Sequence, residues 1–178
     1  MNPAEWLVRT ACLSPTAPAL LKGEKIEADY ATFASRVAAI AGALCAKHRI
    51  CKGSRVAIFM NNRTEYLEAM YGIWFAGAVV VPINAKLHAK EAAWIIENAE
   101  AEIAFVSSDV GKALQAFAPK CLKELIYADL PEFSLLRQHV EMARPKVIHE
   151  DELMWLFYTS GTTGRPKGVM ISSGNISS

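Results

Sequence analysis

The chain has 178 residues, of which 52% are hydrophobic and 21% are charged, and its net charge at pH 7 is +1. This composition is typical of a globular domain and excludes a disordered chain. Because its net charge is nearly zero, the chain also lacks the positive electrostatic field that draws proteins to nucleic acids. Two small basic pairs do not replace that field: Arg144 with Lys146, and Arg165 with Lys167. We therefore expect no nucleic-acid partner.

The N-terminal segment and the longest apolar run indicate where the protein resides. Glu5 and Arg9 interrupt the N-terminus before an apolar stretch of signal-peptide length builds up. The run 69–83 is shorter than the roughly 18–20 residues that cross a bilayer. Four cysteines form no dense disulfide framework: Cys12, Cys45, Cys51 and Cys121. We expect reduced thiols, no membrane span and a cytoplasmic protein.

Cys45, His48 and Cys51 have a spacing that a metal site could use. A structural zinc site needs a fourth ligand, which only the fold could bring from Cys121 or another histidine. Such sites usually contain paired Cys-x-x-Cys segments, and this chain has none. The alternative is a small apolar Cys45 at a helix end beside a solvated His48. We favour that alternative and expect no metal site.

In chain order, the sequence first predicts a short helix at 2–11 and a β-hairpin that turns at Gly23. Apolar residues three and four positions apart then predict a helix over 31–48. Short apolar runs bounded by polar or glycine residues predict buried strands at 56–60, 79–81, 103–106, 125–127 and 153–158. Helical patterns separate these strands at 63–76, 90–99 and 112–117. Gly77 is expected to close the helix before it, since glycine tolerates a left-handed turn.

Residues 129–150 have no clear period and predict an irregular connection that contains one helix at 133–142. Elsewhere strands and helices alternate at the spacing of right-handed crossover units. The sequence therefore predicts an α/β fold with a mainly parallel sheet flanked by helices.

Residues 158–168 read Tyr-Thr-Ser-Gly-Thr-Thr-Gly-Arg-Pro-Lys-Gly. Four hydroxyl side chains lie close together in this segment: Thr159, Ser160, Thr162 and Thr163. Gly161 and Gly164 permit positive φ and a close approach of the backbone to a ligand. Successive amides in such a loop form a concave anion site, and Lys167 adds a compact cation suited to phosphate. The segment therefore predicts a polyphosphate cradle at the end of a strand.

Better-known loops do not fit this segment. A Walker loop counted from Gly161 needs a second glycine at the position of Pro166, and no Gly-x-Gly-x-x-Gly fingerprint occurs. Tyr158 replaces the first glycine of a nucleophile elbow around Ser160. The simplest alternative is a polar turn between strands at 153–158 and 168–171. A match of only three or four residues would favour such a turn, whereas the unbroken run seen here favours the phosphate cradle.

The segment from Tyr158 to Gly168 resembles the phosphate-loop signature of the adenylate-forming, or AMP-binding, superfamily. That superfamily includes acyl-CoA synthetases, aryl-CoA ligases, firefly luciferase and adenylation domains of peptide synthetases. Upstream segments resemble it in the same order: Pro18-Ala-Leu20, Tyr30, Gly53-Ser-Arg-Val-Ala57, Asn62 and Gly77-Ala-Val-Val-Val-Pro-Ile-Asn84. The resemblance covers nearly the whole chain and implies the N-terminal subdomain of the adenylate-forming enzyme fold.

The resemblance also implies a reaction. Residues that match Thr159, Ser160, Gly161, Thr162, Thr163 and Gly164 surround the β- and γ-phosphates of ATP. The residue that matches Lys167 is catalytic and holds the leaving pyrophosphate. A carboxylate attacks the α-phosphorus while Mg²⁺ shares the charge, and coenzyme A usually takes the acyl group. ATP, Mg²⁺, coenzyme A and a small carboxylic acid are therefore the expected cofactors and partners.

The sequence departs from the family in two respects. Ser172-Ser173 replaces a common Thr-His pair, so any role of that histidine near the acyl or nucleotide site is absent. Family members also continue for several hundred residues. We therefore expect 1–178 to be the N-terminal portion of the large AMP-binding domain, ending just after the phosphate loop and inactive alone.

Two other functions remain open from the sequence. The chain could be a stand-alone, non-catalytic fold that binds an anion or a partner chain, or an adenylation module of a peptide synthetase. Surface that the absent part normally covers would then favour self-association. The short N-terminal lead, without a carrier-protein segment, favours a stand-alone acyl-CoA synthetase.

Overall fold

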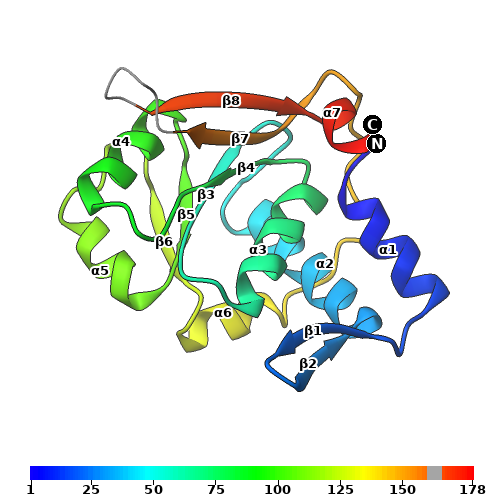
Figure 1. Cartoon of the computed structure of the whole chain (residues 1–178). Helices are drawn as coiled ribbons and strands as arrows, with labels where there is room; N and C mark the ends of the chain where they lie inside the picture. The colour runs from blue at the N-terminus through cyan, green and yellow to red at the C-terminus, as the bar shows by residue number, and fades with distance from the viewer. Residues whose placement is uncertain (160–165) are drawn as a thin grey trace.

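A six-stranded sheet forms the centre of the computed structural model, which describes residues 1–159 and 166–178 (Figure 1). The strand order is β6-β5-β3-β4-β7-β8. The strands are β3 (Arg55–Phe59), β4 (Val79–Pro82), β5 (Ile103–Val106), β6 (Glu124–Tyr127), β7 (Leu153–Thr159) and β8 (Lys167–Ser172). Every neighbouring pair is parallel except β7 and β8, which form an antiparallel hairpin. The predicted α/β fold with a mainly parallel sheet is confirmed.

Helices cover both faces of this sheet (Figure 1). One face carries α1 (Ala4–Leu13), α2 (Tyr30–Ala46), α3 (Thr64–Phe75) and α6 (Pro131–Leu136). The other face carries α4 (Ala89–Asn98) and α5 (Ser108–Gln115). The short helix α7 (Ser173–Ser177) follows β8. In the part of the chain that the structure describes, no helix combines the length and the apolar character needed to cross a membrane.

The central strands are buried on both faces because helices lie above and below them. Val56 and Ile58 of β3 pack into the core under α2 and α3, whereas Ala57 and Phe59 pack into the core under α4 and α5. A strand buried in this way reads as a continuous apolar run, which is how β3, β4 and β5 appear in the sequence.

Local signals in the sequence set several of the element ends. The Asp29 carboxylate accepts a hydrogen bond of 2.8 Å from the N–H of Thr32 and begins α2. The predicted hairpin is also found, as β1 (Pro18–Lys22) and β2 (Lys25–Asp29). Gly77 has φ +75° directly after α3, which confirms that it closes this helix.

Two predicted helix boundaries are wrong. The helix predicted at 112–117 begins four residues earlier, because the polar first turn of α5 hides its start. The helix predicted at 133–142 ends at Leu136. The chain beyond it crosses α2, where the N–H of Met142 donates to the Ala38 carbonyl at 3.1 Å. A Cβ at Gly42 would lie 2.1 Å from the Val140 carbonyl oxygen, so glycine is what lets this segment lie against α2.

Cys45, His48 and Cys51 each have a different partner, which for Cys51 is the Ser54 hydroxyl at 3.4 Å. His48 Nδ1 lies 2.7 Å from Glu124 Oε2, and Cys45 Sγ lies 3.8 Å from Met142 Sδ. Burial raises the pKa of the Cys45 thiol, which opposes the thiolate that a metal would need. Among the described residues, no group of three or more His, Cys, Asp or Glu side chains could hold a metal ion.

A buried carboxylate ties together the helices on the α3 face. Glu68 of α3 has no exposed side-chain surface and lies between two arginines, with Arg36 Nη1 at 3.1 Å and Arg137 Nε at 2.6 Å. The arginines come from α2 and from the end of α6. Since a buried charge is tolerated only when it is paired, Glu68 fixes how these three elements pack.

We expect Glu68→Ala to lower the free energy of unfolding by about 3–5 kcal/mol, because it leaves two arginine charges without their shared partner. Urea denaturation followed by circular dichroism measures this change. Glu24→Ala, at an exposed hairpin turn, is the control and should change stability by less than about 0.5 kcal/mol. Equal effects of the two substitutions would contradict the role given to Glu68.

Candidate functional site

The parallel strands β3 and β4 are neighbours, but the helices that follow them pack on opposite faces of the sheet (Figure 1). Their connecting loops therefore diverge at the carboxyl edge. Ligands of open α/β sheets bind in the crevice that such a reversal creates. β7 runs parallel to β4 on its other side, so its carboxyl end lies at the same edge.

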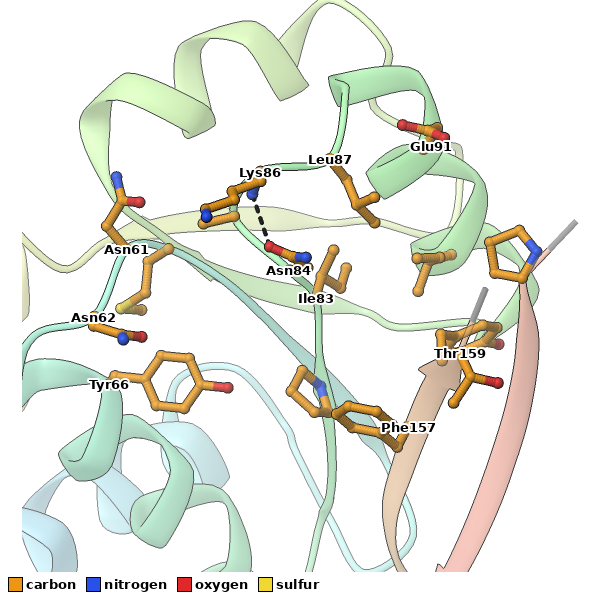
Figure 2. Close-up of a pocket in the computed structure, with 16 residues that line it drawn as sticks. Asn61, Asn62, Tyr66, Ile83, Asn84, Lys86, Leu87, Glu91, Phe157 and Thr159 are labelled. Atoms are coloured by element: carbon orange, nitrogen blue, oxygen red, sulfur yellow. Dashed lines mark hydrogen bonds between the residues drawn. The ribbon is translucent and has the colours of Figure 1, made fainter. Parts of the chain in front are cut away.

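A pocket with a volume of about 930 Å³ occupies this crevice (Figure 2). Its lining comes mainly from residues 60–62 after β3, residues 82–87 after β4, and residues 157–159 at the end of β7. Pro166, just before β8, completes the side next to the hairpin. The pocket thus lies where β3, β4 and β7 end.

The loop after β3 is anchored to α5. The amide of Asn61 donates a 2.6 Å hydrogen bond to Asp109, and the hydroxyl of Ser107 donates a 2.6 Å bond to the same carboxylate. The hydrogen bond from Ser107 holds the pKa of the Asp109 carboxyl below its ordinary value of 3.8. This ionised carboxylate therefore joins the loops that follow β3 and β5.

The loop after β4 forms a tight polar turn at the rim of the pocket. Asn84 Oδ1 accepts a 3.0 Å hydrogen bond from the Lys86 N–H, drawn dashed in Figure 2. Glu91 Oε2 accepts from the His88 N–H at 3.0 Å and completes a capping box at the start of α4. These bonds fix the path of the chain from β4 into α4 along one side of the pocket.

Tyr158 fastens the β7–β8 hairpin to α4. Its hydroxyl donates a 2.7 Å hydrogen bond to Asn98 Oδ1, and its ring meets Trp94 edge-on with centroids 6.2 Å apart. Burial raises the pKa of this phenol, so it stays protonated and able to donate. The end of β7 is thereby held against the helix that borders the pocket.

The sequence-predicted site residues that the structure describes lie together. Thr159 ends β7 and lines the pocket, and it pairs in register with Lys167, the first residue of β8. Lys167 is exposed and has no ion pair with another described residue. The other predicted phosphate-loop residues lie outside the described residues: Ser160, Gly161, Thr162, Thr163 and Gly164.

Ser173, which replaces the family histidine, lies at the opposite end of β8 from Lys167. Its hydroxyl donates a 2.5 Å hydrogen bond to the Met1 carbonyl, and its side chain is buried. It is not among the residues that line the pocket. Ser173, where the chain differs from the family, therefore contacts the N-terminal residue and is not part of the pocket lining.

Sequence reasoning missed the contribution of Asn61, Tyr66 and Asn84 to this pocket. Asn61 follows the apolar run of β3 almost at once, and Asn84 follows that of β4. A polar residue directly after a buried parallel strand is a signal that could have found them. Tyr66 gives no such signal, because it reads as one more aromatic residue on an apolar helix.

Comparison with known proteins places these features in a family. The sequence model described as "AMP-binding enzyme" matches residues 7–178. The chain is 30% identical over 172 residues to a 2-succinylbenzoate–CoA ligase of Geobacillus kaustophilus, a match that covers 96% of this chain and 33% of the relative. It is also 30% identical to 4-hydroxybutyrate–CoA ligase 2 of Metallosphaera sedula, over 79% of this chain and 29% of the relative. The chain thus spans about a third of the length of these relatives.

A solved structure is similar over nearly the whole chain. The inhibitor-bound N-terminal domain of FACL13 from Mycobacterium tuberculosis aligns with a TM-score of 0.83 and 30% identity. The alignment covers 97% of this chain and 45% of that structure.

We expect Asp109→Asn to reduce stability at neutral pH but not in strong acid. Because folding lowers the pKa of Asp109, its ionised form stabilises the fold above the unfolded pKa, and this contribution disappears as the pH falls through the folded pKa. The difference in urea midpoint between parent and variant should therefore shrink below about pH 4. Asp151→Asn is the control. If the difference in urea midpoint between the parent and Asp109→Asn stays constant from pH 7 to strong acid, the stabilising role given to the ionised Asp109 carboxylate is contradicted.

Proposed function

Because the chain belongs to the AMP-binding enzyme family, we propose that it contributes the phosphate-loop part of an ATP-dependent carboxylic acid–CoA ligase. Residues 1–178 then form the N-terminal portion of the large AMP-binding domain. The observation that carries this proposal is the position of Thr159 and Lys167 at the carboxyl edge, beside the pocket between β3, β4 and β7. Curated relatives that are CoA ligases support it, and they do not favour a peptide-synthetase module or a non-catalytic role.

In the proposed reaction, ATP supplies an electrophilic α-phosphorus that the substrate carboxylate attacks. The products are an acyl-adenylate and pyrophosphate, and the thiol of coenzyme A then takes the acyl group and releases AMP. Little of this is covalent chemistry by the protein, so positioning and charge stabilisation carry the rate. The site described above is suited to those two tasks.

Lys167 is the residue proposed to stabilise the leaving group. Lys167 is exposed at the end of the hairpin where β7 and β8 are connected and is free of ion pairs with the described residues, so its ammonium can meet pyrophosphate oxygens. Negative charge builds on these oxygens as the bond breaks, and a contact that strengthens in this way favours the transition state. The Thr159 hydroxyl, one residue before the glycine-rich segment, can donate to the same phosphates.

The residues from Ser160 to Gly164 are proposed to complete the cradle with hydroxyl and amide donors. Mg²⁺ is proposed to bind through the phosphates of ATP, because this small cation is commonly held by substrate phosphates together with one or two carboxylates. Coenzyme A is the proposed acceptor by similarity to the relatives. Self-association remains a prediction, and the exposed apolar side chains of the hairpin are the surface it would use: Phe157, Val169 and Met170.

We expect the isolated chain to catalyse no ATP–pyrophosphate exchange with a panel of fatty and aryl acids. The chain spans about a third of the length of its relatives, so we expect residues from the rest of such an enzyme to be needed to complete the site. Radiolabelled pyrophosphate incorporated into ATP above a buffer blank would contradict this expectation.

Lys167→Ala should weaken binding of pyrophosphate to the chain by about ten- to a hundred-fold, which corresponds to the loss of one charge-assisted contact. Lys167→Arg should recover only part of the affinity, since a planar fork does not replace a compact ammonium. Isothermal titration calorimetry measures both, with Lys25→Ala on the distant hairpin as the control. If Lys167→Ala binds pyrophosphate as the parent does, the proposed role of Lys167 fails.

A further inference from the structure

Asn61 and Asn62 are neighbours in the loop after β3, yet their side chains point in different directions (Figure 2). The Asn61 amide is directed toward α5 and is bound to Asp109. The Asn62 amide lies beside the ring of Tyr66 and lines the pocket. Figure 2 draws no hydrogen bond from Asn62 or from the Tyr66 hydroxyl to any other residue of the pocket lining. Two polar groups therefore face the pocket with their hydrogen-bonding capacity open to a ligand.

The residues on both sides of Asn62 are anchored. Asn61 is held by Asp109 at 2.6 Å. Arg63 Nε lies 2.9 Å from Glu65, and its Nη1 lies 3.6 Å from Asp129 in the loop after β6. With both neighbours bound to other residues, the backbone at Asn62 is held in place on both sides.

The anchor at Arg63 is itself part of a larger ionic network. Glu65 also lies 3.6 Å from Arg137, and Arg137 binds the fully buried Glu68. The position of Arg63 is therefore connected to the packing of α3 against α6. A binding group supported by rigid surrounding contacts loses less entropy when the ligand arrives.

The surroundings of Asn62 and Tyr66 indicate the kind of group they would bind. Much of the pocket wall is apolar: Met60, Ile83, Leu87, Ile95 and Phe157. Burial raises the pKa of the Tyr66 phenol, so it remains a neutral donor. A carboxamide supplies one donor and one acceptor, and neither it nor the phenol carries charge. Such a pair can both donate to and accept from a ligand, which suits an uncharged polar group with donors and acceptors of its own.

We propose that Asn62 and Tyr66 bind an uncharged amide, carbonyl or hydroxyl group of a ligand whose carbon chain packs on the apolar wall, and that Arg63 is a positioning residue that orients Asn62. The inference rests on the proposed function, which offers two sources of this chemistry. One is the acid that is activated, and the other is the arm of the thiol acceptor. The experiment separates the two sources with two probes.

The experiment titrates the intact ¹⁵N-labelled chain with pantetheine and, separately, with 4-hydroxybutyrate, and follows amide shifts by NMR. One probe should bind, and Asn62→Ala and Tyr66→Phe should each raise its Kd about three- to ten-fold. Tyr71→Phe is the matched control, because Tyr71 lies on the same helix and does not line the pocket. A Kd unchanged in Asn62→Ala overturns the proposal.

Arg63 is tested with a double-substitution cycle. Arg63→Ala should raise the Kd for the same probe, and adding Asn62→Ala to it should produce no further increase, because Arg63 acts through Asn62. Arg63→Lys, which keeps a cation near Asp129, should restore part of the affinity. If Arg63→Ala lowers the melting temperature but leaves the Kd unchanged, Arg63 has only a structural role and the positioning claim fails. The claim also fails if the losses of binding free energy from Arg63→Ala and Asn62→Ala simply add.

Binding of pyrophosphate to the same samples separates this inference from the proposed function. If pyrophosphate binds and neither probe binds up to about 10 mM, the inference fails and the phosphate-binding role stands. If pyrophosphate and both probes fail to bind, both proposals fail.

Discussion

The divergence of the helices that follow β3 and β4 is the constraint on which the site depends. Both strands are buried on two faces, so alternate side chains of β3 pack into two different cores. Since α3 and α4 lie on opposite faces, none of the described helices covers the carboxyl ends of these strands, and a pocket lies there. β7 pairs with β4 and ends at the same edge, which brings Thr159 and Lys167 to that pocket.

Polar contacts make this open edge rigid. Asp109 joins the loops after β3 and β5, Tyr158 joins the hairpin to α4, and the network around Glu68 holds α3 to α2 and α6. Each of these bonds links elements that are distant in sequence. Together they fix the loops that carry the pocket residues, which is the preorganisation that a reaction driven by positioning and charge stabilisation requires.

The sequence predicted the elements well where burial alone decides them. The strand at 103–106 is found with the predicted bounds, because all four residues are apolar and covered on both faces. The end of α6 could not be predicted, since it depends on the segment beyond it packing against Gly42 of α2. The start of α5 was missed because Ser108 and Asp109 resemble a loop.

The residues of the candidate site also differ in how far the sequence alone could predict them. Thr159 and Lys167 could be singled out from the sequence because both belong to one short continuous motif. The pairing of Asn61 with Asp109 depends on β5 lying beside β3, and the strand order does not follow the chain order. Everything proposed for this chain requires that ligand binds at the carboxyl edge between β3, β4 and β7. Amide chemical-shift mapping of the chain with magnesium ATP measures where ligand binds. We expect shifts at Asn62, Thr159 and Lys167 and none at Ser173 on the opposite edge; shifts gathered around Ser173, or no shifts at saturating ATP, would show that the site lies elsewhere or is absent.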